Sequence, residues 1–401
     1  MQNTPKSLRL HIALFGRTNV GKSSFLNFII GQKFAITSPI SGTTTDVVEK
    51  AQELPPLGPV LWIDTAGFDD KTELSGERMA VTERVFERAD IAILVCEGDK
   101  IGEVEQKITA RLAEKNIPFI KVYNKSDIYA VTSDDGIAVN CNDISTRNEV
   151  LNQLKMQLIK LCPEDFINTQ PLVGDLLPRH GTAIMIVPLD YEAPKGRLIL
   201  PQVMAIRDCL DHSQNIMVVK EDEYLNVLKN FKTPPSLVVC DSQVVDMMVE
   251  QTPENIPCTT FSILMARFKG DLAKMVQGAQ MIKHLQDGDK ILIAESCTHH
   301  AADDDIGRVK IPNLISKKTG KKLHFDVVSG CDFAKNLKDY KLVIQCGGCT
   351  VNRKQILSHI WQCEQAGVAI TNYGVCISEL KGVLARVIRP FGAIDGDRTP
   401  H

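Results

Sequence analysis

The chain has 401 residues, enough for two or three domains that each bury a core of their own. It carries 46 basic and 49 acidic residues, for a net charge of −3, mixed along the chain without a basic block. This balance argues against a protein that follows the phosphates of a nucleic acid. The first residues lack the apolar stretch of a signal peptide, and no segment approaches the roughly 20 apolar residues of a membrane span. We therefore expect a cytoplasmic protein with neither a membrane nor a nucleic acid as partner.

Residues 1–165 alternate short apolar runs with amphipathic helical patterns. This rhythm is typical of an α/β domain with a doubly wound parallel sheet. The expected strands cover residues 12–15, 60–63, 91–95 and 119–123. A break that begins with Cys-Pro-Glu-Asp at 162–165 separates this segment from the rest of the chain.

Residues 16–23 read Gly-Arg-Thr-Asn-Val-Gly-Lys-Ser, which matches the phosphate-binding pattern G-x-x-x-x-G-K-[ST]. The motif lies between an expected strand and an expected helix, as its mechanism requires. Backbone N–H groups and the helix N-terminus would hold phosphates, Lys22 would reach the β and γ oxygens, and Ser23 would coordinate Mg²⁺. The predicted nucleotide contacts in this loop are Gly16, Asn19, Gly21, Lys22, Ser23 and Ser24.

Two later motifs predict that the nucleotide is GTP. Residues 64–67, Asp-Thr-Ala-Gly, close an expected strand and supply a carboxylate on the outer side of the metal. Residues 124–127, Asn-Lys-Ser-Asp, follow another strand, and a carboxylate there can accept hydrogen bonds from guanine N1 and N2, a donor pair that adenine lacks. The predicted base contacts are Asn124, Lys125, Asp127 and, at the position that usually reads Ser-Ala, Cys141. The predicted catalytic residues are Lys22, Asp64, Gly67 and Thr44, which would cap Mg²⁺ from a switch loop.

These residues resemble the TrmE-Era branch of the translation-factor-type GTPases, whose loop reads G-R-x-N-x-G-K-S and whose switch reads G-T-T-x-D. The resemblance implies that Asn19 binds K⁺, as the matching asparagine does in potassium-activated members. Phe68 follows the third strand where Ras-like proteins keep a glutamine that orients water. We expect slow unassisted hydrolysis, on the order of 10⁻⁴ to 10⁻² s⁻¹.

The rest of the chain repeats the α/β rhythm twice. In the middle segment the expected strands are 183–187, 216–219 and 237–240, with a weaker one at 259–263. In the last segment a helix at 272–285 precedes the first strand. The strands expected there are 290–294, 324–328, 342–344 and 368–371.

Three cysteines follow two of these strands directly. Cys297 lies in Glu-Ser-Cys-Thr-His-His, and Cys346 and Cys349 lie in Gln-Cys-Gly-Gly-Cys. Loops at the carboxyl ends of parallel strands are where open α/β sheets build their sites, and three thiolates there suggest a metal or an iron-sulfur cluster. The spacing alone fits a structural zinc site equally well, with His299 as fourth ligand. Six other cysteines are expected to be structural: Cys96, Cys209, Cys240, Cys258, Cys331 and Cys363.

The cysteine pattern consists of C-x-H, ending at His299, then a gap of residues 300–344, and then C-x-x-C, beginning at Cys346. Together with the GTPase motifs, this pattern resembles the HydF family of [FeFe]-hydrogenase maturation GTPases over the whole chain. The resemblance implies a GTPase domain at 1–165, a dimerisation domain at 170–264 and an iron-sulfur domain at 265–401. It implies a [4Fe-4S] cluster on Cys297, Cys346 and Cys349, with His299 as candidate fourth ligand. Gln345 stands where many members have a histidine.

The same resemblance implies a scaffold that receives the diiron precursor of the hydrogenase H-cluster. Its implied partners are a second copy of the chain, two radical-SAM maturases and the [FeFe]-hydrogenase apoprotein. The alternative is a TrmE-Era-type GTPase that acts on RNA or ribosomes and has a structural zinc domain, against which the near-neutral charge counts. A redox enzyme is a third hypothesis, but the chain has no substrate-site motif to support it.

Overall fold

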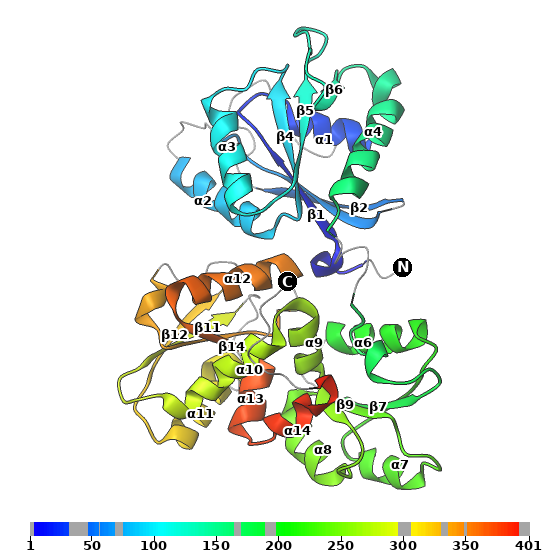
Figure 1. Cartoon of the computed structure of the whole chain (residues 1–401), viewed down its shortest axis with the longest axis vertical. Helices are drawn as coiled ribbons and strands as arrows, with labels where there is room; N and C mark the ends of the chain where they lie inside the picture. Colours follow the sequence, from blue (N-terminus) through cyan, green and yellow to red (C-terminus); the bar gives the residue numbers. More distant parts are fainter. Residues whose placement is uncertain are drawn as a thin grey trace. The chain divides into compact units, whose positions relative to one another are not determined.

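The computed structural model describes residues 4–31, 47–55, 57–68, 75–163, 170–188, 198–295, 306–329, 336–348 and 351–392. The chain divides into two compact units, Met1–Thr169 and Gln170–His401 (Figure 1). Each unit is described by itself below.

The first unit is built on a six-stranded sheet with the order β2-β3-β1-β4-β5-β6. Neighbouring strands are parallel except for β2, which runs antiparallel to β3. The strands are β1 (Leu10–Phe15), β2 (Val48–Leu54), β3 (Gly58–Asp64), β4 (Ile91–Glu97), β5 (Phe119–Asn124) and β6 (Gly136–Val139). All four expected strands are confirmed. The strands β2 and β6 were not expected, because β2 is a mostly polar edge strand and β6 has only four residues.

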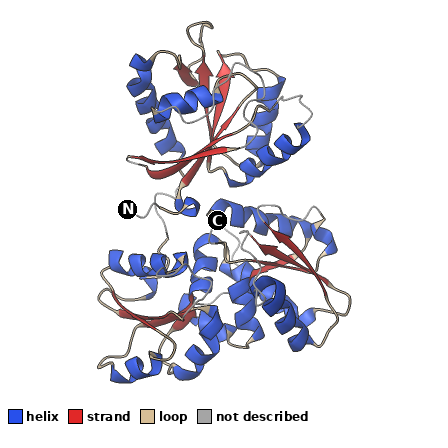
Figure 2. Cartoon of the chain, turned by 180° about the vertical axis from the view of Figure 1, so that it is seen from behind, coloured by secondary structure: helices blue, strands red, loops and turns tan. Residues whose placement is uncertain are grey.

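Helices cover both faces of this sheet (Figure 2). They are α1 (Lys22–Ile30), α2 (Ser75–Arg88), α3 (Glu103–Glu114) and α4 (Arg147–Leu161). Because side chains alternate along a strand, β1 supplies Ile12 to one buried cluster, with α1 and α4, and Phe15 to the other, with α2 and α3. The sheet is therefore the middle layer of three, and its strands end in loops that can approach a ligand together.

The second unit contains two four-stranded sheets, ordered β10-β9-β7-β8 and β12-β11-β13-β14, in which all paired strands are parallel. Their strands are β7 (Thr182–Ile186), β8 (Asn215–Val219), β9 (Leu237–Cys240), β10 (Cys258–Thr260), β11 (Lys290–Glu295), β12 (His324–Ser329), β13 (Leu342–Gln345) and β14 (Ala369–Asn372). Each expected strand is present, but the weak strand expected at 259–263 ends at Thr260. The Thr260 side chain accepts a hydrogen bond from the Ile263 N–H, which caps a helix that begins at Phe261.

The helices of this unit are α6 (Leu200–Asp211), α7 (Tyr224–Asn230), α8 (Val245–Gln251), α9 (Phe261–Lys269), α10 (Leu272–Gln280), α11 (Ile311–Thr319), α12 (Arg353–Ala366), α13 (Tyr373–Leu380) and α14 (Leu384–Ile388). Short 3-10 turns flank them, and Ile306–Lys310 forms one π turn. The helix expected at 272–285 ends at Gln280 and continues as a 3-10 turn, Met281–His284. The expected boundary at 264/265 falls inside α9 and stays a prediction.

The two sheets of the second unit share one buried core. Ile184 and Val238 of the first sheet belong to the same apolar cluster as Leu292 and Val343 of the second. Two further clusters cover the outer faces of the sheets. Of the six cysteines expected to be structural, five are buried: Cys96, Cys209, Cys240, Cys258 and Cys363. The sixth, Cys331, lies outside the described residues.

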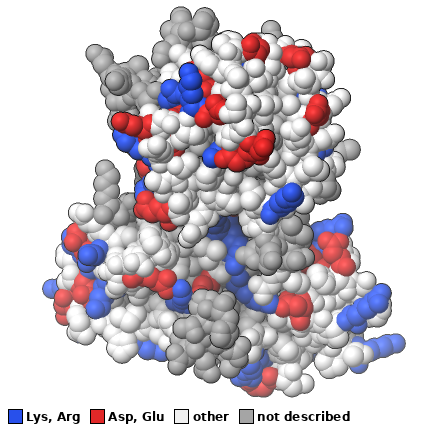
Figure 3. Space-filling model, turned by 45° about the horizontal axis from the view of Figure 1, so that its top comes forward, with Lys and Arg blue, Asp and Glu red and all other residues white. Residues whose placement is uncertain are grey.

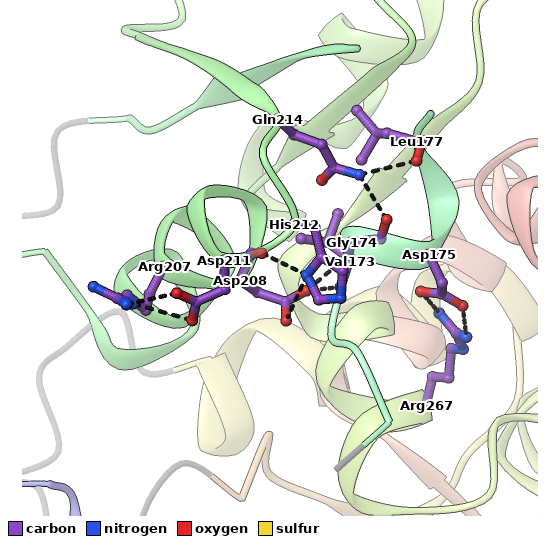
Figure 4. Close-up of polar contacts among 10 residues, drawn as sticks. All are labelled: Val173, Gly174, Asp175, Leu177, Arg207, Asp208, Asp211, His212, Gln214 and Arg267. Carbon is purple, nitrogen blue, oxygen red and sulfur yellow. Dashed lines mark hydrogen bonds and ion pairs between the residues drawn. The ribbon is translucent and has the colours of Figure 1, made fainter. Parts of the chain in front are cut away.

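The segment that opens the second unit is held by side chains from two helices (Figure 4). The Asp208 carboxylate accepts hydrogen bonds from the backbone N–H groups of Gly174 and the residue before it, at 2.7 and 2.8 Å. The Gln214 amide donates to the Gly174 carbonyl at 2.6 Å, and Arg267 of α9 pairs with Asp175. The segment is thereby joined to both α6 and α9.

Within the described residues, no helix combines the length and the apolar character needed to cross a bilayer. On the face drawn in Figure 3, basic and acidic side chains lie interspersed over both units. This matches the nearly balanced charge of the sequence.

Candidate functional site: the phosphate loop and the cysteine loop

The phosphate loop is a tight turn between β1 and α1. The Lys22 side chain is buried, and its Nζ donates to the Gly16 and Arg17 carbonyl oxygens at 3.2 and 2.8 Å. Asn19, at the exposed tip, has a φ of 64°. Gly21 caps α1 with a φ of 95°, and a Cβ there would meet the Asn124 amide nitrogen at 2.2 Å. The loop therefore folds around its own lysine, with backbone that only glycine adopts easily at Gly21.

Ser23 and Asp64 form the expected magnesium pair. The Ser23 hydroxyl donates to Asp64 Oδ2 at 2.5 Å, across the ends of α1 and β3. Asp64 is fully buried, and its Oδ1 has no hydrogen-bond partner among the described residues. Burial raises the pKa of the Asp64 carboxyl, although the Ser23 hydrogen bond and the Lys22 charge act in the opposite direction. An oriented hydroxyl beside a buried carboxylate oxygen fits an oxygen-preferring divalent cation, whose charge would favour the ionised acid.

The loop after β3 lies directly against the phosphate loop. The Phe68 N–H donates to the Gly16 carbonyl at 3.2 Å. A Cβ on Gly67 would meet Thr18 Oγ1 at 2.1 Å and two Thr18 backbone atoms at 2.6 Å. Only glycine fits this approach, so the predicted Gly67 is placed next to the phosphate-binding residues.

The third motif is tied to the phosphate loop through Asn124. Its amide nitrogen donates to the Val20 carbonyl at 2.8 Å, and its side chain is buried. Lys125 has a φ of 59°, and its ammonium lies 2.5 Å from Glu97 Oε1 at the end of β4. The hydrogen bond from Lys125 lowers the pKa of Glu97. The structure therefore brings the base motif and the phosphate motif together at one edge of the sheet.

The predicted guanine contacts Asp127 and Cys141 lie near each other. The Ser126 N–H donates to the Val139 carbonyl at 3.2 Å, which joins the base motif to the end of β6. Asp127 is exposed, as a residue that receives a base must be. Burial raises the pKa of the Cys141 thiol to about 12, and the charge of Asp127 adds to this rise. A thiol at that position stays neutral at physiological pH.

Sequence reasoning missed two residues that support this site, Glu97 and Glu105. Glu105 of α3 is fully buried, and its two oxygens accept from Arg17 Nε at 2.6 Å and from the Gly102 N–H at 2.9 Å. It thereby joins the phosphate loop to α3. Glu97 could have been suspected from its place at a strand end, but Glu105 had no signal, because it looks like an ordinary first-turn acid.

The cysteine loop, residues 346–352, follows the end of β13 and precedes α12. The Cys346 N–H donates to the Ala294 carbonyl at 2.8 Å, and Ala294 and Gln345 pair across β11 and β13. Cys346 is half-buried. The strand β11 ends at Glu295, two residues before Cys297. Two of the predicted ligand segments therefore leave the same edge of the sheet, which fits a site built from soft thiolate ligands.

Several predicted site residues lie outside the described residues: Thr44, Cys297, His299 and Cys349. Among the residues that are described, no three His, Cys, Asp or Glu side chains are gathered around a metal position. Gln345, which stands before Cys346, is buried, and its Oε1 lacks a hydrogen-bond partner within the described part of the chain. The cluster ligand set stays a prediction.

An ion pair joins the end of β11 to the π turn Ile306–Lys310. Arg308 Nη2 lies 2.8 Å from Glu295 Oε2 and donates to the Ser329 hydroxyl at 2.9 Å. The Ser329 hydroxyl donates to the same Glu295 carboxylate at 3.0 Å. The ends of β11 and β12 are thereby joined to the turn that follows residues 296–305.

Three family models match consecutive parts of the chain. Residues 11–125 match a 50S ribosome-binding GTPase model. Residues 172–270 match the hydrogen maturase F dimerization domain, and residues 273–390 match the hydrogen maturase F tetramerization domain.

Curated relatives match the first unit. GTPase Der of Thermosynechococcus vestitus is 35% identical over 35% of this chain and 31% of its own length. The tRNA modification GTPase MnmE of Bordetella avium is 37% identical over 38% of this chain and 34% of its own. The chain thus spans about a third of the length of these relatives.

Matches among solved structures include Era of Aquifex aeolicus bound to GDP and AlF4⁻. It is 14% identical, covers 80% of this chain and 92% of its own, and has a TM-score of 0.28. A probable GTP-binding protein EngB is 20% identical over 38% of this chain and 97% of its own, with a TM-score of 0.26.

Proposed function

This chain belongs to the hydrogen maturase F family, and from that premise we propose that it is a GTP-hydrolysing scaffold for the maturation of [FeFe]-hydrogenase. The observation that carries the proposal is the presence, in one chain, of a GTPase site and two domains characteristic of that family. In this proposal the last segment holds a [4Fe-4S] cluster and delivers the diiron precursor to the hydrogenase apoprotein.

The nucleotide half of the proposal assigns a task to each described residue. Lys22 would move from the loop carbonyls to the β and γ oxygens, and Ser23 and Asp64 would hold Mg²⁺. Gly67, which lies against Thr18 of the phosphate loop, would donate its N–H to the γ-phosphate. Thr44 would complete the metal shell. Because Phe68 follows Gly67, no glutamine orients water at that position, and turnover without a partner should be slow.

Potassium is the proposed source of additional positive charge. Asn19 lies at the exposed tip of the phosphate loop. In this proposal its side chain would bind the ion beside the β and γ phosphates. Such an ion would supply the charge that an arginine finger provides in other GTPases. Hydrolysis in K⁺ should therefore exceed hydrolysis in Na⁺ for the wild-type protein, and Asn19→Ala should remove the difference. Equal wild-type rates in the two salts would exclude this role for Asn19.

The cluster half of the proposal assigns Cys297, Cys346 and Cys349 as ligands. Their thiolates would bind three irons, and the fourth iron would keep an exchangeable ligand such as His299 or water, which a carrier needs in order to accept and release cargo. Proposed partners are a second copy of the chain, radical-SAM maturases that build the diiron precursor, and the hydrogenase apoprotein. The dimerization and tetramerization matches support self-association. The proposed setting is the cytoplasm, whose reducing conditions preserve free thiols.

Anaerobic iron and sulfide analysis, with EPR, tests the cluster. The wild type should hold about four irons per chain if each carries the proposed cluster. Cys346→Ala should lose the cluster and fail to activate apo-hydrogenase, because a missing thiolate leaves one iron without its ligand. Cys363→Ala is the matched control, since Cys363 is buried in the same unit and lies outside the ligand pattern.

A colourless wild-type protein with one zinc and no iron would contradict the proposal. That result would favour the alternative, a GTPase with a structural zinc domain that acts on RNA or ribosomes. The relatives named Der and MnmE motivate this alternative, but their similarity covers only 35% and 38% of this chain.

A further inference from the structure

A buried lysine lies behind the cysteine loop. Lys269, the last residue of α9, is 2% exposed. Its Nζ donates to the Gly348 carbonyl at 2.8 Å and to the Val351 carbonyl at 2.9 Å. Gly348 stands between Cys346 and Cys349, and Val351 is two residues beyond Cys349. The Lys269 ammonium therefore binds backbone carbonyls that precede and follow Cys349 in the sequence.

The loop is shaped to present these carbonyls. Gly348 has a φ of 65°, and a Cβ there would meet the Ile356 side chain at 2.8 Å. At the neighbouring helix start, Arg353 Nη1 donates to the Phe268 carbonyl at 3.0 Å. The end of α9 therefore donates hydrogen bonds to the cysteine loop through Lys269 and accepts one from Arg353, which follows that loop.

Placing an ammonium in a protein interior is unfavourable unless hydrogen bonds and nearby negative charge offset its loss of hydration. Backbone carbonyls supply the hydrogen bonds here. Thiolate ligands would supply negative charge on the same loop. A cluster bound by three thiolates gains a further negative charge when it is reduced, so a buried cation beside the loop stabilises the reduced state more than the oxidised state.

We propose that Lys269 is a positioning residue that orders the cysteine loop and raises the reduction potential of the cluster bound there. This inference rests on the proposed function. It also links two parts of the chain, because Lys269 lies in the stretch that matches the dimerization domain and its acceptors lie in the stretch that matches the tetramerization domain.

The test uses reconstituted full-length protein and a redox titration with dithionite and mediators, followed by EPR. Lys269→Met and Lys269→Gln remove the charge at similar side-chain length, and Lys269→Arg keeps it. Lys274→Met is the matched control, because Lys274 lies in the first turn of the next helix, has a side chain that is 41% exposed and pairs with Glu364 at the surface. Thermal unfolding of the cluster-free proteins checks that each variant is folded.

We expect the Met and Gln variants to shift the redox equilibrium about tenfold towards the oxidised cluster, which is about 59 mV for one electron. Lys269→Arg and Lys274→Met should stay within about twofold of the wild type. Folded Met or Gln variants with wild-type iron and wild-type potential would overturn the proposal. If both neutral variants lose their iron, the arginine variant must retain iron and potential, and its loss of iron would also overturn the proposal. Wild-type protein without iron would overturn the proposed function itself, whereas an iron-loaded wild type with insensitive variants overturns only the role of Lys269.

Discussion

The phosphate loop and the cysteine loop are each held by a buried lysine, but the two lysines come from different parts of the chain. In each, a buried lysine ammonium donates to two loop carbonyls: Lys22 to residues 16 and 17, and Lys269 to residues 348 and 351. The first lysine belongs to its own loop and reaches five or six residues back, whereas the second reaches 79 and 82 residues along the chain. The lysine that holds the phosphate loop is therefore local to that loop, whereas the lysine that holds the cysteine loop belongs to a distant helix.

This difference predicts different vulnerabilities. The Lys22 contacts form whenever the strand-loop-helix forms, so they should tolerate changes in distant helices, whereas Arg17 and Val20 of the same loop also have partners 88 and 104 residues away. The cysteine loop should respond to changes in α9 as well as to changes in its own residues. The following experiments separate the two loops, from the largest expected effect to the smallest.

Lys22→Ala should reduce GTP hydrolysis about 1,000-fold, because a charged donor to the transferring phosphate is lost. Iron content should not change, because Lys22 and the cysteines belong to separate compact units. Phosphate release and iron analysis on the same preparation measure both effects. Lys107→Ala, at an exposed position on α3, is the control. A parallel loss of iron in the Lys22 variant would show that the two loops are not independent.

Asp127→Asn should weaken the preference for GTP over XTP by about 10- to 100-fold, since a bidentate base contact contributes about 1 to 3 kcal/mol. The amide presents a donor to a guanine donor, and xanthine offers an acceptor there instead. Competition between the two nucleotides for hydrolysis measures the ratio. Asp134→Asn, on the exposed loop before β6, should keep the wild-type ratio. An unchanged ratio for Asp127→Asn would remove this carboxylate from base recognition.

Acid should destabilise both units through one buried histidine in each. Burial lowers the pKa of His11 in β1 and of His359 in α12 to about 4. Above pH 6.5 each imidazole is neutral whether folded or unfolded, but between pH 6.5 and about 4 only the unfolded chain takes up the proton. Stability should therefore fall as the pH falls, by about 2 kcal/mol per histidine at pH 5.

The measurement is the difference in unfolding temperature between pH 7 and pH 5. His11→Leu and His359→Leu should each reduce this difference in their own unit, whatever their effect on stability at pH 7. His284→Asn is the control, because His284 is exposed. A pH difference that survives in both leucine variants would assign the acid sensitivity to other groups.

The smallest expected effect comes from a substitution at Gly348 in the cysteine loop. Gly348→Ala places a side chain at a φ of 65° and should cost about 1 to 2 kcal/mol of local stability. Iron should then be lost to a chelator several-fold faster than from the wild type. Gly347→Ala is the matched control, because a Cβ there meets nothing within 4 Å. Equal rates for the two variants would mean that the loop conformation does not limit cluster retention.

Several structural elements could be predicted from the sequence because their determinants are local. The pattern of residues 16–23 encodes a strand-loop-helix turn, and short apolar runs correctly indicated the buried strands of all three sheets. The order Asp64, Asn124 and Asp127 along the chain was enough to place their loops at the carboxyl edge of one sheet. The family resemblance added the domains that carry the cysteines.

Tertiary structure alone decided the remainder. The mostly polar strand β2 exists because it pairs with β3. Glu105 and Lys269 look like ordinary helix-end charges until folding buries them against Arg17 and the Gly348 carbonyl. Their partners lie 88 and 79 residues away, and no local pattern records a contact that is created by packing.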